Sequence, residues 1–372
     1  MRVKQYISKL DYQLRVINWR KRIGKQILED SLVHGQLVPL TKEQVEAVDR
    51  VWGSRKKLFD WRWFELYNWE HPEVGVDIWK FIPVDYWITY IDPMFTQPLA
   101  APVFDDKNMY SLYFPDIRQP QTVVRLMNGL FLDANYETMT EEEALSACVE
   151  AGQVVLKPTT VTSGGSGILF WDSDNDSLDV LQQVFSSGRS YIVQAVVRQH
   201  PVMALLNESS CNTMRILSLI HDGEITVFPT SFVRFGGKGS RVDNVSSGGF
   251  CAAVNKNGEI IGYARNHHET RIDVPHGVIP NYNKCLDIVR CNTPRLVHVT
   301  NLVAWDFAIA EDGEPVLLEI NIARTSIQSF QALWGPILGD YVEWFLRRVP
   351  VRPGSNNQLS RCIMNILSRL DG

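Results

Sequence analysis

The chain has 372 residues, of which 45% are hydrophobic and 21% charged, and its formal net charge is -5. A chain of this length can bury a large core in two or three domains. Its mild acidity lacks the strongly basic footprint that nucleic-acid-binding proteins usually show. The six cysteines have no CxxC spacing, which argues against a zinc site or a disulfide framework and is typical of a reducing compartment.

The sequence shows neither a secretory signal nor a membrane span. Its first 25 residues lack the apolar segment of a signal peptide. It also holds no run of about 18 apolar residues, which a transmembrane helix needs. These features predict a cytoplasmic protein without a transmembrane segment.

Residues 1–90 are expected to be mostly helical. They begin with a basic stretch and include the aromatic-rich sequence LFDWRWFELYNWE at 58–70. This sequence favours core packing of a helical extension; the alternative is a peripheral contact with a membrane or a partner protein. Several prolines between residues 91 and 120 predict an irregular connector.

From about residue 121 the pattern becomes that of a mixed α/β protein. The sequence TEEEALSACVEAG predicts a helix that Thr140 caps, with Glu143 at the capping-box position and Gly152 at its end. A series of runs rich in β-branched and aromatic residues predicts strands: VVLK, ILFW, YIVQAVV, TMRILSLI, EITVFPTSFV, GFCAAV, EIIGYA, LVAWDFAIA and PVLLEIN. From about residue 336 the periodicity is helical again.

The sequence LVAWDFAIAEDGEPVLLEINIA, residues 302–323, places two acids inside strands that should be apolar. A type I′ turn at its Asp-Gly dipeptide would set Asp306 directly opposite Glu319. Asn321 would share the face of Glu319, because side chains alternate along a strand. Opposed acids destabilise a hairpin, and a divalent cation relieves that repulsion. We therefore predict a Mg²⁺ site, since this ion prefers a few hard oxygen ligands.

Two alternatives to the metal site stay open. The hairpin could be an ordinary surface hairpin, although AAVNKNGEIIGYA, which has a similar Asn-Gly turn, carries no acids inside its strands. A bulged three-residue loop would shift Asp306 by one position relative to Glu319 and would weaken the metal interpretation.

The sequence VVLKPTTVTSGGSGILFW combines Lys157, at the end of a strand, with a glycine-rich loop. Glycine-rich backbone can approach phosphates and donate N–H groups to them. Common alternatives do not fit: GxxxxGK[ST] is absent, the loop opens a strand rather than a helix, and the kinase order of loop before lysine is reversed. The loop residues expected to bind phosphate are Ser163, Gly164, Gly165, Ser166 and Gly167.

The order of these motifs resembles that of the sugar-transfer-associated ATP-grasp family, which is linked with bacterial surface-polysaccharide synthesis. The resemblance covers roughly residues 100–330 and rests on FDDKNMYSLYFPDI, LKPTTVTSGGSG, LNESSCNTMRI, FGGKGSRVDNVSSGG and WDFAIAEDGEPVLLEIN. It implies an α/β (α+β) ATP-grasp fold, in which two mixed α/β subdomains clamp ATP behind a mainly helical N-terminal extension. The implied segments are the extension at 1–90, the N-terminal part of the fold at 91–198, the C-terminal part with the metal site at 199–345, and a C-terminal helix at 346–372.

The resemblance also implies which residues bind the nucleotide and its metal. Lys107 and Lys157 would hold the phosphates, and the hinge backbone would contact the adenine. The implied nucleotide-binding residues are Lys107, Lys157, the loop from Ser163 to Gly167, Gln194, Ala195, Val196, Val197 and Asn212. Asp306, Glu319 and Asn321 match the magnesium ligands of the family.

Catalytic roles are implied for Arg215, Lys238, Arg241, Asn244 and Arg324. Arg215 would clamp the γ-phosphate, with a structural ion pair as the alternative. Lys238 or Arg241 would close over the reacting phosphate from a mobile loop in which Asn244 orients the substrate; an inert connection is the alternative. Arg324 would bind the acceptor carboxylate, or have only a surface role.

The function implied by the resemblance is that of an ATP- and Mg²⁺-dependent, ADP-forming carboxylate–amine ligase. Such an enzyme activates a carboxylate as an acylphosphate, which an amine then attacks. The substrates would be small molecules, namely a sugar or amino-acid building block of a surface polysaccharide such as a capsule, and the N-terminal region could contact a membrane or a glycan-assembly partner. Two alternatives remain: a phosphotransferase with a hydroxyl acceptor, and a non-catalytic nucleotide-binding scaffold.

Overall fold

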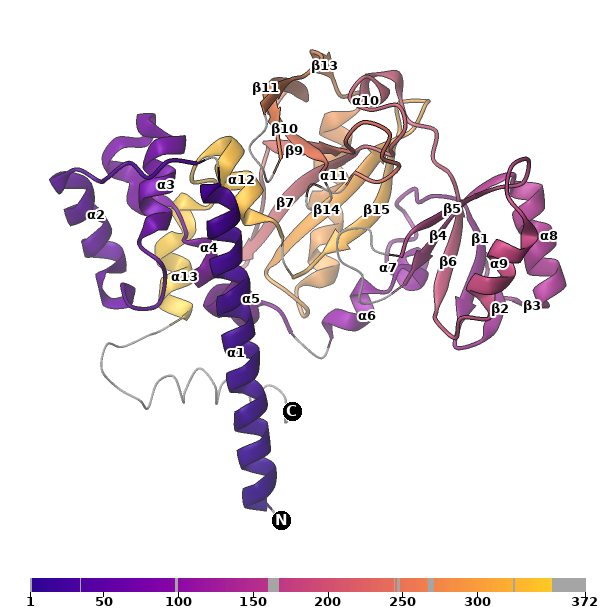
Figure 1. The fold of residues 1–372 in the computed structure, drawn as a ribbon, viewed down its shortest axis with the longest axis horizontal. Helices are drawn as coiled ribbons and strands as arrows, with labels where there is room; N and C mark the ends of the chain where they lie inside the picture. Colours follow the sequence, from indigo (N-terminus) through magenta and orange to yellow (C-terminus); the bar gives the residue numbers. More distant parts are fainter. Residues whose placement is uncertain are drawn as a thin grey trace. The chain divides into compact units, whose positions relative to one another are not determined.

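The computed structural model describes residues 2–33, 35–97, 100–159, 167–243, 245, 248–266, 271–323 and 325–349, with the backbone alone for residues 2–13. The chain divides into two compact units (Figure 1). Unit 1 comprises Met1–Leu99, His267–Arg271 and Ala323–Gly372, and unit 2 comprises Ala100–Asn266 and Ile272–Ile322. Unit 1 thus joins sequence from both ends of the chain, whereas the expected division at residues 90, 198 and 345 stays a prediction.

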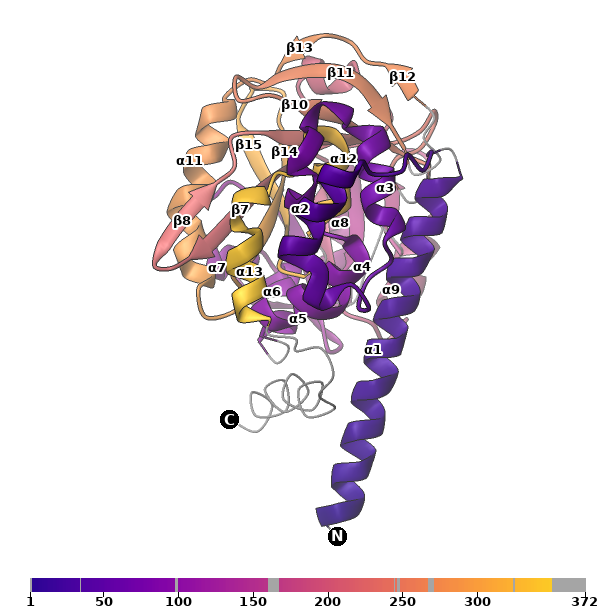
Figure 2. The same ribbon diagram turned by 90° about the vertical axis from the view of Figure 1, so that its left-hand side faces the viewer.

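Unit 1 is helical in its described residues (Figure 2), which confirms the helical character expected for the N-terminal region. Its α-helices are α1 (Arg2–Leu32), α2 (Lys42–Trp52), α3 (Arg62–Glu70), α4 (Val84–Tyr86), α5 (Asp92–Phe95), α12 (Ile327–Trp334) and α13 (Val342–Arg348). Its 3₁₀- and π-helical segments are η1 (Gly53–Arg55), η2 (Pro72–Lys80), η3 (Trp87–Ile91) and η7 (Gly339–Tyr341).

The aromatic-rich sequence at 58–70 lies in the core of unit 1. Trp63, Phe64 and Tyr67 are all buried, and the ring of Tyr67 stacks on that of Phe81 with centroids 4.3 Å apart. Buried aromatic pairs of this kind add to the stability that burial of their apolar area supplies. The interpretation of this sequence as core is confirmed.

Unit 2 contains two antiparallel sheets, and the smaller has the strand order β3-β2-β1-β6-β4-β5. Its strands are β1 (Thr122–Met127), β2 (Leu130–Leu132), β3 (Thr138–Met139), β4 (Gln153–Pro158), β5 (Leu169–Asp172) and β6 (Tyr191–Ala195). Helices α8 (Glu141–Ala151) and α9 (Leu178–Phe185) pack on one face (Figure 1) and share its hydrophobic core. Strands β1 to β3 are not among those expected from the sequence.

Helix α8 begins and ends where the sequence predicts. The Thr140 hydroxyl accepts a hydrogen bond from the Glu143 N–H at 3.2 Å, and the Glu143 carboxylate accepts one from the Thr140 N–H at 2.7 Å. Gly152 follows the helix with φ +75°, a conformation that favours glycine. The capping box and the stop are both confirmed.

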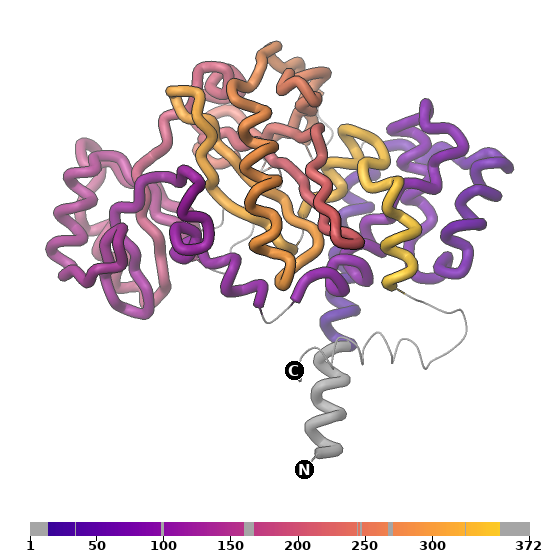
Figure 3. The backbone as a smooth tube through the Cα atoms, turned by 180° about the vertical axis from the view of Figure 1, so that it is seen from behind, coloured from indigo at the N-terminus to yellow at the C-terminus, as the bar shows by residue number. Residues whose placement is uncertain are grey.

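The larger sheet has the order β12-β11-β10-β9-β7-β14-β15, with β13 paired to β11 and β8 paired to β7. Its strands are β7 (Thr213–His221), β8 (Glu224–Val227), β9 (Ser231–Phe235), β10 (Phe250–Val254), β11 (Glu259–Arg265), β12 (Arg271–Asp273), β13 (Gly277–Val278), β14 (Leu302–Ile309) and β15 (Pro315–Asn321). Helix α11 (Tyr282–Asn292) lies against β7 and β8 (Figure 3). The run EITVFPTSFV, expected as one strand, divides into β8 and β9.

An irregular connector was expected between residues 91 and 120. The structure instead has short helical segments within residues 100–117 of unit 2. These are α6 (Ala101–Asp105), η4 (Lys107–Met109) and α7 (Tyr110–Tyr113), and two further short segments are α10 (Pro201–Ala204) and η6 (Thr293–Leu296). Tyr110 and Phe114 join the core of the larger sheet, so this packing holds Lys107 beside that sheet.

Strand β14 is buried on both faces. Val303, Trp305 and Phe307 point into the main core of the larger sheet, and Ala308 packs in a small separate cluster with Val316. Because side chains alternate along a strand, Asp306 shares the face of Ala308 rather than that of Trp305. The acid therefore lies on the side of the sheet away from the main core.

Within the described part of the chain, no helix has the length and apolarity required to cross a bilayer.

Candidate active site

The hairpin of β14 and β15 carries the three predicted metal ligands. The Ala310 N–H donates to the Glu314 carbonyl at 2.9 Å, which leaves three residues in the loop. Gly313 has φ +80°, whereas Asp312 is not among the residues with positive φ. The expected type I′ turn is therefore wrong, because that turn requires positive φ at both of its central residues.

A β-bulge restores the predicted pairing of the two acids. Near the turn Phe307 pairs with Leu317, and a regular ladder would then place Leu318 opposite Asp306. The register shifts at this point, so that Asp306 pairs with Glu319. The predicted pairing is confirmed, but for a different reason. The three-residue loop shifts the register of the two strands by one residue, and the bulge shifts it back. The extra residue, Leu318, lines the same cavity as Glu319.

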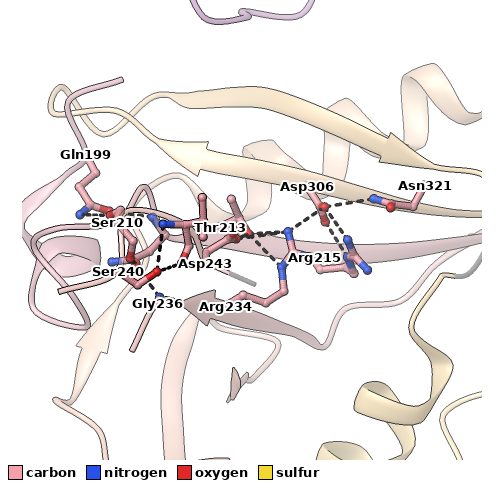
Figure 4. Close-up of polar contacts among 12 residues, drawn as sticks. Gln199, Ser210, Thr213, Arg215, Arg234, Gly236, Ser240, Asp243, Asp306 and Asn321 are labelled. Atoms are coloured by element: carbon pink, nitrogen blue, oxygen red, sulfur yellow. Dashed lines mark hydrogen bonds and ion pairs between the residues drawn. The ribbon is translucent and has the colours of Figure 1, made fainter. Parts of the chain in front are cut away.

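Asp306 is the centre of a buried ion-pair network (Figure 4). Arg215 on β7 donates Nε to Oδ1 and Nη2 to Oδ2, both at 2.6 Å. Arg234 on β9 donates to Oδ2 at 2.9 Å, and the Asn321 amide donates to the same atom at 3.1 Å. The side chains of Asp306 and Arg215 are only 1% and 4% exposed. Arg215 thus forms the structural ion pair named as its alternative role, and its contact with a phosphate stays a prediction.

The network keeps Asp306 and Arg234 charged. Burial by itself would raise the pKa of Asp306, but the guanidinium groups of Arg215 and Arg234 outweigh burial and hold that pKa below its usual value. Burial by itself would lower the pKa of Arg234, but the carboxylates of Asp243 and Asp306 raise it above its usual value. The carboxylate of Asp306 is therefore ionised at neutral pH despite its burial.

Both lysines predicted to bind phosphate line one cavity. Lys107 pairs with Glu319, with 2.7 Å between Nζ and Oε1. Lys157 on β4 donates to the Gln194 side-chain oxygen at 3.0 Å. Burial lowers the pKa of Lys157, because an ammonium group is less stable away from water. An anion beside Lys157 would offset that effect.

The cavity lies between the two sheets of unit 2 and encloses about 120 Å³. Its charged or polar lining residues are Lys107, Lys157, Thr213, Arg234, Arg241, Asp243, Asp306 and Glu319. Its remaining lining residues are Pro120, Val155, Ile168, Phe170, Ala195, Val196, Val197, Cys211, Val242 and Leu318. The hinge residues Ala195–Val197, predicted to contact adenine, are thus brought to the same place as the lysines and the two acids.

A larger hollow, of about 540 Å³, also borders the hinge residues. It is lined by Arg118, Arg198, Glu311 and Asp312 but by neither predicted lysine nor any predicted metal ligand. Arg118 and Asp312 pair with each other at 2.7 Å, and both are half exposed. The smaller cavity is the candidate site, because it holds the set of charges that the chemistry needs.

The described residues of the segment between β9 and β10 are anchored at several points. The Asn207 amide donates to the carbonyl oxygens of Gly236 and Gly237 at 2.9 and 3.1 Å. A Cβ atom at Gly236 would lie 2.6 Å from the Val242 carbonyl oxygen, so this fold-back requires glycine. The Arg241 guanidinium lies 4.1 Å from the ring centroid of Phe170 on β5, a cation–π contact between this segment and the smaller sheet.

Other predicted site residues are placed differently or fall outside the described residues. Lys238 is exposed and is not part of the cavity lining. The buried Asn212 amide donates to the carbonyls of Met203 and Asn207 at 2.7 and 2.8 Å, so it stabilises a loop rather than facing the cavity. Gly167 has φ +79°. Ser163, Gly164, Gly165, Ser166, Asn244 and Arg324 lie outside the described residues.

Three polar residues of the cavity were not expected from the sequence. Arg234 donates to the Thr213 hydroxyl from Nε at 3.1 Å and from Nη2 at 2.9 Å, and its Nη2 lies 3.3 Å from an Asp243 oxygen. A sequence signal for Arg234 existed: it is a charged residue inside the apolar run SFVRF, the same kind of signal that identified Asp306. Thr213 and Asp243 carry no comparable signal.

The oxygens of the β14–β15 hairpin fit Mg²⁺. Asp306 and Glu319 contribute carboxylates, and Asn321 contributes an amide within hydrogen-bond distance of Asp306. Among the described residues, no group of three or more His, Cys, Asp or Glu side chains is arranged to hold a metal. The amide of Asn321, water and phosphate oxygens would therefore complete the coordination, as is usual for this ion.

Comparisons with known proteins agree with the motif order. The profile described as sugar-transfer associated ATP-grasp matches residues 88–340, which is more than half of the chain. No curated protein sequence is significantly similar to it. The match covers the two mixed α/β parts that the fold was expected to have, and the helical N-terminal region lies before it.

Several solved structures resemble the chain at low identity. D-alanyl-alanine synthetase A from Vibrio cholerae O1 biovar eltor is 14% identical, with a TM-score of 0.39, over 73% of this chain and 67% of that one. The ADP complex of purK, N5-carboxyaminoimidazole ribonucleotide synthetase, is 13% identical, with a TM-score of 0.40, over 63% and 52%. D-cycloserine synthetase DcsG is 12% identical, with a TM-score of 0.41, over 81% and 93%. Likenesses this distant carry no inference about substrate or site.

Proposed function

The chain belongs to the sugar-transfer associated ATP-grasp family, and we propose that it is an ATP- and Mg²⁺-dependent ligase that joins a carboxylate to an amine. The observation that carries the proposal is that Lys107, Lys157, Asp306 and Glu319 line one cavity beside the hinge. Ammonium groups for phosphates, carboxylates for a hard cation and an apolar wall for a base are the components that MgATP requires.

The adenine would lie against the hinge, between apolar side chains such as Val155 and Leu318. The N–H groups of Ala195 and Val196 already donate to the carbonyls of Gln121 and Gln153, at 2.9 and 3.1 Å. Contacts with the edge of the base would therefore fall to the hinge carbonyls and to Val197. This assigns the adenine to backbone groups, in agreement with the role that the resemblance gives to these residues.

The triphosphate would be held by the two lysines. Lys107 would exchange the Glu319 carboxylate for a phosphate oxygen, which would free Glu319 as a ligand. Lys157 would gain an anionic partner and recover the stability that burial takes from its charged form. Asp306, Glu319 and Asn321 would hold the Mg²⁺, which when bound supplies charge neutralisation at the phosphates.

In the proposed reaction a substrate carboxylate oxygen attacks the γ-phosphorus, which yields an acylphosphate and ADP. The amine then attacks the acyl carbon, and an amide and inorganic phosphate are released. The chain's own residues position these groups and exclude water, so that the acylphosphate meets the amine. The cavity of about 120 Å³ is smaller than the ~300–1,000 Å³ of typical ligand sites. Its walls would therefore separate to admit ATP, and the contact of Arg241 with Phe170 would open.

The family name supports a substrate connected with sugar transfer, and we assign the carboxylate and amine to building blocks of a bacterial surface polysaccharide. The test is to incubate the full-length protein with ATP, Mg²⁺ and a pooled library of carboxylates, amines and sugars, and to analyse the products by mass spectrometry. We expect a condensed product together with ADP and free phosphate. A product that retains the phosphate would instead identify a phosphotransferase with a hydroxyl acceptor.

A nucleotide-binding scaffold would give a third result, in which ATP binds but no acceptor is consumed. Binding of the nucleotide is measured separately, by calorimetry with a non-hydrolysable ATP analogue and Mg²⁺. A protein that binds neither the analogue nor Mg²⁺ would contradict the enzyme and the scaffold alike.

A further inference from the structure

We propose that Asp243 is a positioning residue, which offers Arg234 a second carboxylate so that Asp306 can exchange this arginine for a metal ion. The inference rests on the proposed function of the site and deepens it. It concerns residues to which neither the motif order nor the family match assigns a role.

A continuous chain of polar contacts connects the segment after β9 with the predicted metal ligands (Figure 4). The Thr213 hydroxyl donates to the Asp243 carboxylate and accepts from Arg234. Arg234 Nη2 is shared, with 2.9 Å to an oxygen of Asp306 and 3.3 Å to an oxygen of Asp243. One guanidinium therefore bridges a carboxylate on β14 and a carboxylate on the loop.

The bridging position matters because Arg234 is largely buried, with its side chain 16% exposed. A metal ion at Asp306 competes with the arginines for the carboxylate oxygens. An arginine that released Asp306 with no other anion nearby would be a buried unpaired charge, which is strongly destabilising. Asp243 removes this obstacle, because Arg234 can retain one carboxylate and one hydroxyl while it gives up Asp306.

Arg215, the other arginine at Asp306, is placed differently. It makes two bonds of 2.6 Å to the carboxylate and is 4% exposed, whereas Arg234 Nη2 also lies 3.3 Å from an oxygen of Asp243. Arg234 thus has a second carboxylate, that of Asp243, within ion-pair distance. Once Asp306 is released, Arg234 would move toward Asp243 and tighten the loop that carries Asp243.

The first experiment titrates Mg²⁺ into the full-length protein with a saturating non-hydrolysable ATP analogue, followed by calorimetry. Asp243→Asn keeps the size of the side chain and its ability to accept from Thr213, but removes the charge that Arg234 needs. We expect the Mg²⁺ affinity to fall by about 10–100-fold, the range for partners that orient a metal site. Asp243→Glu should recover most of the affinity.

The matched control is Asp312→Asn, which removes one negative charge from unit 2 at an exposed turn outside the cavity. Its Mg²⁺ affinity should equal that of the wild type. A double-mutant cycle with Arg234→Gln tests whether Asp243 acts through Arg234. In that background Asp243→Asn should change the affinity by less than about twofold, because two residues acting as one unit are not additive.

The second readout needs no turnover. Lys238 and Arg241 are exposed trypsin sites on the loop that Asp243 anchors, and cleavage after each is followed by mass spectrometry. Mg²⁺ with the ATP analogue should slow cleavage several-fold in the wild type and much less in Asp243→Asn.

Two results would overturn the inference. One is an unchanged Mg²⁺ affinity in Asp243→Asn, even if its loop is cut faster, since that describes a loop anchor without influence on the metal. The other is a loss of Mg²⁺ affinity on Asp243→Asn that is as large in the Arg234→Gln background as in the wild-type background. Wild-type protein that binds no Mg²⁺, with or without the analogue, would instead refute the proposed function and this inference together.

Discussion

The hairpins β10–β11 and β14–β15 of unit 2 have the same kind of turn. In β10–β11 the Asn255 N–H donates to the Glu259 carbonyl at 3.0 Å, and Gly258 has φ +81°. In β14–β15 the Ala310 N–H donates to the Glu314 carbonyl at 2.9 Å, and Gly313 has φ +80°. Both hairpins also contain a register shift a few residues from the turn. Their local backbone design is shared.

The two hairpins differ in their neighbours. Strand β14 lies between β7 and β15, and Arg215 of β7 is paired with Asp306 in the ladder. Strand β10 lies between β9 and β11. Glu259 of that hairpin is exposed, and its carboxylate accepts a hydrogen bond from the nearby Asn255 amide. The comparison teaches that an Asx-Gly turn fixes a hairpin but not its chemistry. The chemistry depends on what adjacent strands present to the same face.

The largest expected effect compares the acid of each hairpin. Glu319→Ala should lower Mg²⁺-dependent turnover by at least about a hundredfold, since loss of groups that only orient a metal ligand already costs ~10–100-fold. Glu259→Ala, the matched control, should leave turnover unchanged. Steady-state kinetics with varied Mg²⁺ gives both values, and similar rates for the two variants would remove the distinction between the hairpins.

The next effect concerns stability. Asp306→Ala leaves two arginines without their shared carboxylate, and we expect the free energy of unfolding to fall by about 3 kcal/mol in urea titrations. Asp312→Ala at the exposed turn should change it by less than about 0.5 kcal/mol. Because the folded-state pKa of Asp306 is lowered, its contribution is fully present above the unfolded pKa. The difference from wild type should persist from pH 7 to about pH 4 and shrink only below that. A difference already lost at pH 6 would contradict the ionised network.

The smallest effect tests the bulge residue. Leu318→Ala removes apolar wall from the cavity, and we expect affinity for the ATP analogue to fall by about tenfold, because each buried CH₂ is worth about 0.8 kcal/mol and this side chain is partly buried. Ile261→Ala, at a partly buried position of β11, is the matched control and should bind the analogue like the wild type. Equal affinities for all three proteins would mean that the bulge serves only to correct the register.

Much of the fold could be predicted from the sequence because it depends on local signals. The capping box of α8 and the strands around the hinge follow from periodicity, caps and turns that lie within a few residues of one another. The metal ligands could be proposed for a similar reason, since charges inside an apolar strand need a partner. Strands β1 to β3 were missed, and so were Thr213 and Asp243, whose roles arise only from contacts with distant residues.

By itself the sequence determined that Asp306 and Glu319 belong to one hairpin, that a lysine precedes a glycine-rich loop, and that the motif order is that of an ATP-grasp protein. Only the tertiary structure decided how the acids come to be opposite each other, because the loop length and the bulge compensate through the whole ladder. It also decided which cations face them. Arg215 and Arg234 come from β7 and β9, far from Asp306 in sequence, and a buried charge selects its partners by proximity in the folded chain.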